Sequence, residues 1–305
     1  MMLGFMQMLI LLVVGVMGLA FVTLVERKIL SLVQWREGPN KTGGGYLQPF
    51  SDALKLISKG WVMLSEGDMG GYVMSAWLFI FLMMLLWGIY PTFWGVYSLE
   101  WSLLGFVLVL SVGVYGLLMS GWMSNSKYSL LGGVRSVAQT ISYEVSLVLV
   151  LMYWVLYMGG YGVEVMMSGV WLMFLNVLMF VVVGMVCISE LNRSPFDFSE
   201  GESELVSGYN VEYGSLLFVY IFMSEYGFIV FWGSLLSWMF MGGLGGMIGG
   251  LKVLLMSWGI LWWRGVLPRF RYDKLMILSW GVLLYCSLWG YVMALGCMLV
   301  VWWVS

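Results

Sequence analysis

Two glutamates lie inside long apolar runs, where a charge is costly. Glu144 and Glu225 each stand well within a stretch long enough to form a membrane helix. A charge near mid-membrane costs about 2.5–3.5 kcal/mol on insertion scales, so such residues are usually functional. Burial raises the pKa of a carboxyl group toward neutral pH, which suits proton transfer. The alternative is a glutamate that only hydrogen-bonds a neighbouring helix as a packing contact.

A second concentration of acids lies in residues 190–213. Six carboxylates surround Arg193 there: Glu190, Asp197, Glu200, Glu202, Glu204 and Glu212. Like charges this crowded should keep some protons near neutral pH. A solvated acidic loop is the usual explanation of such a run. Here Phe196, Phe198 and other apolar residues are interleaved with the acids, which indicates a partly buried, functional loop.

The basic residues cluster at predicted helix ends. They include Arg27, Arg36, Arg264, Arg269 and Arg271. The positive-inside rule explains most of this placement without any further role. Lys252 stands apart at the edge of a predicted helix, where it could serve a proton path or only extend its amine to the interface.

The amino-acid composition predicts the class of protein in which these groups are positioned. Of 305 residues, 62% are hydrophobic and 10% are charged, against about 25% charged in a soluble domain. The chain is therefore predicted to be an all-α integral membrane protein forming a single transmembrane domain over residues 1–305. The net charge of −2 gives no sign of a nucleic-acid partner. There is no histidine, and the three cysteines are widely spaced, so no metal, haem or iron–sulfur site is expected within this chain.

About eight transmembrane helices are predicted, over residues 3–25, 72–94, 101–122, 137–158, 170–189, 214–241, 251–263 and 275–303. The first run is too long for the apolar core of a signal peptide and has no cleavage site, so it is read as a membrane helix. With this count, thirteen of the fourteen lysines and arginines fall on one side of the membrane, the inner side. Both termini are then expected on the opposite side.

One helix should lie at the interface instead of crossing it. Leu47, Phe50, Leu54 and Ile57 recur at helical spacing, and polar residues fall between them. Pro49 suits the first turn of a helix. A short amphipathic helix over about residues 47–60 is therefore predicted.

Several segments resemble a known family, subunit 1 of mitochondrial NADH–ubiquinone oxidoreductase (respiratory complex I). Three segments are similar to its first inner loop: Glu-Arg-Lys-Ile-Leu at 26–30, Gly-Pro-Asn-Lys at 38–41 and Leu-Gln-Pro-Phe-Ser-Asp-Ala-Leu-Lys at 47–55. Residues 135–144, Arg-Ser-Val-Ala-Gln-Thr-Ile-Ser-Tyr-Glu, resemble its fourth helix, and residues 190–213 resemble its most distinctive stretch. Residues 268–276, with Arg264 before them, resemble its last inner loop. Glu37 and Lys127 depart from the usual family residues.

The resemblance implies a core subunit of a proton-pumping enzyme in the mitochondrial inner membrane, with ubiquinone as substrate. It implies no flavin, iron–sulfur cluster or metal in this chain. Its partners would be lipid and other complex I subunits, including neighbouring membrane-arm subunits and the peripheral-arm subunit that holds the terminal iron–sulfur cluster. The residues that match positions near the quinone are Arg27, Arg36, Asp52, Asp197, Glu200, Glu202, Glu204 and Arg264. Those that match the proton path are Glu144, Glu190 and Glu225.

Two alternatives remain open on sequence alone. The membrane subunit of an energy-converting hydrogenase shares ancestry and several carboxylates with this family. A stand-alone ion-coupled transporter would be expected to contain inverted repeats and interrupted helices, and no such pairing is found in the sequence.

Overall fold

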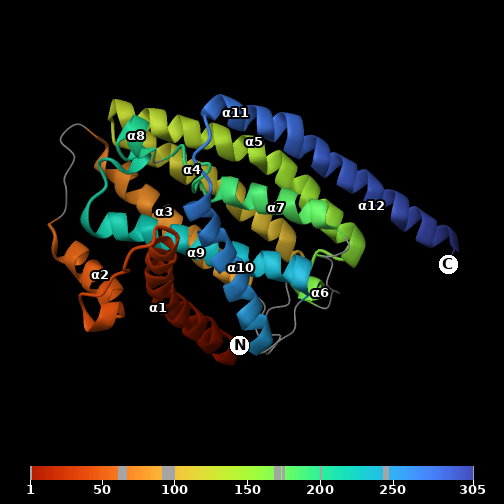
Figure 1. Ribbon diagram of the computed structural model, residues 1–305, viewed down its shortest axis with the longest axis horizontal. Coiled ribbons are helices and arrows are strands. Elements are labelled where there is room, and N and C mark those ends of the chain that lie inside the picture. The colour runs from red at the N-terminus through yellow and green to blue at the C-terminus, as the bar shows by residue number, and fades with distance from the viewer. Residues whose placement is uncertain are drawn as a thin grey trace.

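The computed structural model describes residues 2–60, 67–90, 100–167, 173, 176–199, 201–242 and 247–304. Within these ranges every regular element is a helix, which confirms the predicted all-α class. In the hydrocarbon core only internally bonded elements can satisfy their backbone groups, so long apolar helices are the expected result. Figure 1 shows these helices as an elongated bundle.

Each of the eight predicted membrane segments coincides with a helix. The long helices are α1 (Met2–Val33), α3 (Met69–Gly88), α4 (Ser102–Met123), α5 (Lys127–Met158), α7 (Val177–Glu190), α9 (Ser215–Met241), α10 (Met247–Val266) and α12 (Leu284–Val304). Among the described residues, five spans are long and apolar enough to cross a membrane: α3, α4, α5, α9 and Tyr272–Val300, while α7 is a shorter apolar helix.

Several predicted boundaries were wrong: α3 ends at Gly88 and not at residue 94, α7 begins at Val177 and not at residue 170, and the two largest differences are in α1 and α5. Helix α1 continues to Val33, past the predicted end at residue 25, and α5 begins at Lys127, ten residues before the predicted start. The first extension carries Glu26 and Arg27 into the helix, where both find ion-pair partners. The second starts where the Ser126 side chain accepts a hydrogen bond from the Ser129 amide, which caps the helix. Hydropathy alone places neither boundary, because charged side chains supply the contacts in α1 and a serine hydroxyl supplies the cap of α5.

Several short elements lie at one end of the bundle, which we call the inner end. There lie α2 (Gln48–Ser58), α8 (Glu202–Leu205) and the neighbouring 3-10 turn η2 (Gly208–Asn210). Figure 1 shows α2 and α8 toward the left, whereas α6 (Val163–Met167) and both termini lie toward the bottom and right.

Close backbone contacts hold η2 and α4 against α5. A Cβ atom on Gly132 of α5 would lie 2.9 Å from the Gly208 Cα atom, and one on Gly121 of α4 would lie 3.1 Å from the Gly133 Cα atom. Small residues let membrane helices approach in this way. Larger side chains here would push the acidic loop away from the bundle.

Helix α2 forms where the amphipathic pattern predicts it, with Pro49 in its first turn. Phe50 packs edge-on against Phe21 of α1, with ring centroids 5.7 Å apart. Leu54 and Ile57 remain exposed. One face of α2 is therefore apolar and open, as expected for a helix at a membrane interface or against another subunit.

The last span has an irregular turn. Helix α11 (Tyr272–Ile277) runs through a π-helical turn, η3 (Leu278–Leu283), directly into α12. Before this turn Leu275 is fully buried, and beyond it Gly290 meets Met179 of α7. In Figure 1 this span runs along the upper right edge of the bundle beside α5 and ends at the C-terminus.

Candidate functional site

The acidic loop is packed into the inner end of the bundle. Phe196 and Phe198 are fully buried, although Val206 is exposed. The buried Gln139 side chain of α5 donates one hydrogen bond to the Ser189 carbonyl (2.8 Å) and one to the Phe196 carbonyl (3.0 Å). These bonds fix the loop against α5.

The last inner loop covers the acidic loop from the other side. The Phe270 amide donates to the Pro195 carbonyl at 3.1 Å. The Phe196 and Phe270 rings lie 5.5 Å apart, and the Arg269 guanidinium lies over the Phe198 ring at 5.1 Å. Two segments that resemble family motifs, far apart in sequence, thus form one packed unit.

A buried network of ion pairs connects four parts of the chain at this end. Arg193, in the acidic loop, donates from Nη1 to Glu26 of α1 at 3.2 Å and from Nη2 to Glu225 of α9 at 3.3 Å. Arg264 of α10 donates to the same Oε1 atom of Glu26. The Glu26 side chain is 3% exposed and that of Arg193 is 11% exposed. We call these four residues the inner ion-pair network.

Aromatic residues complete this network. The Tyr209 hydroxyl of η2 donates to Glu225 at 2.7 Å, and the Arg193 guanidinium lies 4.7 Å from the centroid of the Tyr226 ring. Burial by itself would lower the pKa of Arg193, but the carboxylates of Glu26 and Glu225 raise it above its ordinary value. Arg193 is therefore a permanent cation between two acids.

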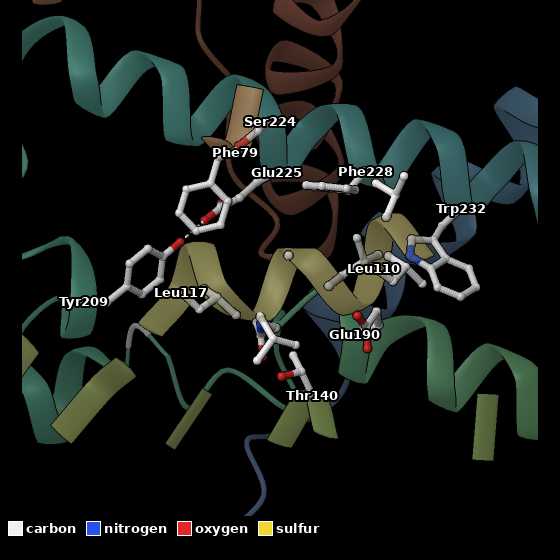
Figure 2. A pocket seen from close by; sticks show the side chains of 15 residues that line it. Phe79, Leu110, Leu117, Thr140, Glu190, Tyr209, Ser224, Glu225, Phe228 and Trp232 are labelled. Atoms are coloured by element: carbon white, nitrogen blue, oxygen red, sulfur yellow. Dashed lines mark hydrogen bonds between the residues drawn. The ribbon is translucent and has the colours of Figure 1, made fainter. Parts of the chain in front are cut away.

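A cavity of about 80 Å³ extends from Glu225 to Glu190. Its walls are mostly apolar, and Thr140, Ser224 and Tyr209 add polar groups. Figure 2 shows Glu225 and Glu190 on opposite sides of it, with Leu110 and Leu117 of α4 between them. The Oε2 atom of Glu190 is buried and has no hydrogen-bond partner among the described residues. The volume is enough for several water molecules, which a buried carboxylate could bind.

Glu144 extends the row of carboxylates away from the cavity. It lies near the middle of α5, is half-buried and interacts electrostatically with Glu190. The structure thus brings together the three predicted proton-path residues, in the order Glu225, Glu190, Glu144, with the inner ion-pair network at the Glu225 end.

The other predicted basic residues lie in a separate, open pocket. Arg27 pairs with Asp52 of α2 at 2.7 Å, and Gln48 donates to the other Asp52 oxygen at 3.1 Å. Arg36 is exposed and lines the same pocket as Arg27 and Gln48. Of the predicted quinone-chamber residues whose side chains the structure describes, only Arg264 belongs to the inner ion-pair network.

The acidic residues of the loop do not form one cluster in the described structure. Glu204 is exposed and pairs with Arg135 of α5 at 2.7 Å. Asp197 is half-buried and interacts electrostatically with Glu225. Glu200 and the Glu202 side chain lie outside the described residues.

Lys252 is buried and hydrogen-bonded to backbone carbonyls at the end of α9. It is 8% exposed, and its Nζ atom donates to the carbonyls of Met241 (2.7 Å) and Gly242 (2.8 Å). Helix α9 ends at Met241, so the ammonium group caps the free carbonyls at the negative end of that helix. This contact explains the buried charge without a proton path.

Comparisons with known proteins identify the family of this chain. The model of the NADH dehydrogenase family matches residues 6–295. The chain is 45% identical to NADH-ubiquinone oxidoreductase chain 1 of Aedes aegypti over 296 residues, which covers 92% of this chain and 91% of the relative. It is 43% identical to the protein of the same name from Heterololigo bleekeri, over 88% of each chain, and 41% identical to that from Mytilus edulis, over 89% and 90%. The chain belongs to the NADH dehydrogenase chain 1 family.

Sequence reasoning gave no role to two residues of the site in this member of the family. Glu26 belongs only to a motif of the resemblance, and Tyr209 is one unnamed residue of the loop at 190–213. The available signal for Glu26 was its place at the end of an apolar run, one residue before Arg27. Its partners are 167 and 238 residues away in the chain, so local spacing could not reveal them.

Proposed function

We propose that this chain joins the ubiquinone chamber to the proton path in a proton-pumping NADH–ubiquinone oxidoreductase. One observation carries the proposal: buried ion pairs connect the acidic loop to Glu225, and a cavity leads from Glu225 to Glu190. Relatives named NADH-ubiquinone oxidoreductase chain 1 support the same reaction. Ubiquinone is the substrate at the inner end.

We assign eight quinone-chamber residues to this end. They are Arg27, Arg36, Asp52, Asp197, Glu200, Glu202, Glu204 and Arg264. Reduction of a quinone takes up two electrons and two protons, so negative charge develops near its oxygens before the protons arrive. Arginines stabilise such a charge, and nearby carboxyl groups can supply or exchange protons.

Negative charge at the quinone then changes the electrostatic potential at the buried carboxyl groups. Arg193 and Arg264 carry it electrostatically to Glu225, and protons redistribute among Glu225, Glu190 and Glu144 toward neighbouring subunits. The cavity supports this step, since Glu190 and Glu225 both line it and water there would bridge groups that do not touch. In this proposal the side chains of this chain supply the coupling and the proton path, whereas the electrons come from carriers held by other subunits.

The proposed setting is the mitochondrial inner membrane, with the inner end toward the matrix and both termini in the intermembrane space. The electron carriers are assigned to other subunits, foremost the peripheral-arm subunit with the terminal iron–sulfur cluster. This assignment rests on the absence of histidine and on the separation of Cys187 in α7 from Cys286 and Cys297 in α12. A hydrogenase subunit or a free-standing transporter is not favoured, because the relatives carry the oxidoreductase name.

The test uses the assembled complex in sealed membrane vesicles. Glu190→Gln removes a titratable group while keeping its shape, and we expect the coupled proton-transfer rate to fall by about 10²-fold. Oxidation of NADH by an artificial acceptor should be unchanged. Glu164→Gln, at an exposed carboxylate of α6, is the matched control. Full proton pumping in Glu190→Gln, or migration of this chain outside a large assembly on a native gel, would contradict the proposal.

A further inference from the structure

Glu26 is at the centre of the inner ion-pair network, although it is not one of the proposed proton-path carboxylates. A single oxygen, Oε1, accepts from both Arg193 and Arg264. The other two pairs in this region that involve α1 or α5, Arg27–Asp52 and Arg135–Glu204, are exposed, whereas Glu26 is buried. A carboxylate so deeply buried is retained at a cost, which calls for a specific role.

Arg193 is shared between two acids. Its Nη1 atom faces Glu26 and its Nη2 atom faces Glu225, while the guanidinium face lies on the Tyr226 ring. A guanidinium is planar and rigid, so its two nitrogens move together. If the bond to Glu26 is lost, only the Tyr226 ring and the contact with Glu225 itself still orient the guanidinium.

The network also connects Glu225 to a more accessible charge. Arg264 is 33% exposed, three times the value for Arg193 and far above that for Glu26. The path from Arg264 to Glu26, Arg193 and Glu225 is continuous and carries two positive and two negative charges. A new charge that attracts Arg264 would weaken its bond to Glu26 and thereby change how Arg193 is shared.

We propose that Glu26 is a positioning residue of the proton path, which holds Arg193 at Glu225 and makes that contact sensitive to charge at Arg264. Glu26 itself passes no proton. The inference rests on the proposed function, because it assigns a control element to the same carboxylate path.

A double-mutant cycle tests the proposal in the assembled complex. The variants are Glu26→Gln, Glu225→Gln and the combination, and the readout is protons moved per NADH oxidised in sealed vesicles. Glu26→Gln should lower coupled proton transfer about tenfold while oxidation of NADH by an artificial acceptor is kept. In the Glu225→Gln background the same change should have no further effect, because Glu26 acts only through Glu225.

The outcomes separate the two proposals. If the two single effects multiply in the double variant, Glu26 acts independently of Glu225 and the inference is wrong. If Glu225→Gln alone pumps normally, the proposed function fails at that residue, whatever Glu26 does. Asp273→Asn, which removes the exposed partner of Arg271, is the matched control for loss of an ion pair and should pump normally.

A second variant addresses assembly. Glu26→Asp keeps the charge but shortens the side chain by one methylene group, so the complex should assemble while the contact with Arg193 lengthens. We expect a loss of coupling between those of wild type and Glu26→Gln. Normal coupling in an assembled Glu26→Asp complex would overturn the positioning role, because the geometry would then not matter.

Discussion

The inner end of the bundle contains two kinds of ion pair. Arg27–Asp52 and Arg135–Glu204 lie at the surface with short contacts of 2.7 Å. The contacts of Arg193 to Glu26 and Glu225 are longer, at 3.2 and 3.3 Å, but are mostly buried, with side-chain exposures of 11% for Arg193, 3% for Glu26 and 21% for Glu225. If contact length alone set the strength of an ion pair, the exposed pairs would be the stronger ones. Burial reverses this order.

The difference follows from solvent. Water and salt screen the exposed pairs, which typically contribute no more than about 1 kcal/mol. A buried ion pair stabilises the fold little more than two well-packed apolar residues would. Removal of one partner is nevertheless costly, because it leaves the other charge buried and unpaired. Loss of a buried pair should therefore reduce stability the most. The buried pairs should also transmit a change of charge from one group to the next, because water does not screen them.

The largest effect is expected from Arg193→Ala. It leaves Glu26 and Glu225 without their shared cation, at a cost of about 3–5 kcal/mol. The amount of assembled complex and its thermal midpoint should both fall. Arg193→Lys restores the charge but not the two-pronged geometry, so an intermediate loss is expected. An Arg193→Ala complex as stable as Asp273→Asn would refute the distinction between buried and exposed pairs.

Tyr209→Phe should have the next largest effect. It removes the 2.7 Å hydrogen bond to Glu225. Hydrogen bonds to charged groups contribute about 1.5–3 kcal/mol, so thermal stability and proton transfer should both decline. Tyr213→Phe removes a hydroxyl that is 2.7 Å from the Ser75 hydroxyl and serves as the control. That variant should lose about 1 kcal/mol of stability with normal pumping; equal pumping defects in both would remove the special status of Glu225.

Filling the cavity should slow proton transfer without breaking any ion pair. Gly113 lines the cavity, and a Cβ atom added there would meet nothing within 4 Å. Gly113→Val should displace water between Glu190 and Glu225 and raise the barrier by an amount on the order of 1 kcal/mol, a several-fold slower rate. Gly296→Val on α12 also enters open space and is the control. Unchanged pumping in Gly113→Val would mean that the cavity carries no protons.

The smallest effect is expected for the exposed pair Arg27–Asp52. A double-mutant cycle with Arg27→Gln and Asp52→Asn should give a coupling energy in thermal stability of about 0.2–1 kcal/mol. Salt should reduce it further. A coupling that is larger, and insensitive to salt, would place this pair with the buried ones.

The sequence predicted most of the fold because apolar runs and helical spacing are local signals. All eight membrane segments and the helix over Gln48–Ser58 appear near their predicted positions. The extension of α1 to Val33 was missed, since Glu26 and Arg27 look like the start of a loop until their partners are known. The early start of α5 depends on a cap at Ser126, a local signal that hydropathy ignores.

The site was predictable in composition but not in pairing. Glu144, Glu190 and Glu225 were predicted as a proton path; the structure places Glu190 and Glu225 on one cavity and Glu144 near Glu190, and their role in proton transfer stays a prediction. The division of the arginines was not predictable: Arg264 joins the buried network while Arg36 is exposed. This outcome depends on contacts between α1, α10 and a loop that are distant in the chain, and spacing along one helix contains no information about them.

The π-helical turn at Leu278–Leu283 has a consequence for the length of this segment. A π turn holds one more residue than the α-helical turn it replaces, and each residue of an α-helix advances the face by about 100°. Deleting one residue within this turn would convert it into an ordinary α-helical turn, so Leu275 would stay buried and Gly290 would still face Met179. The same deletion elsewhere in α12 would rotate every following residue by about 100°. A one-residue deletion should therefore be tolerated better inside the π turn than anywhere else in this span.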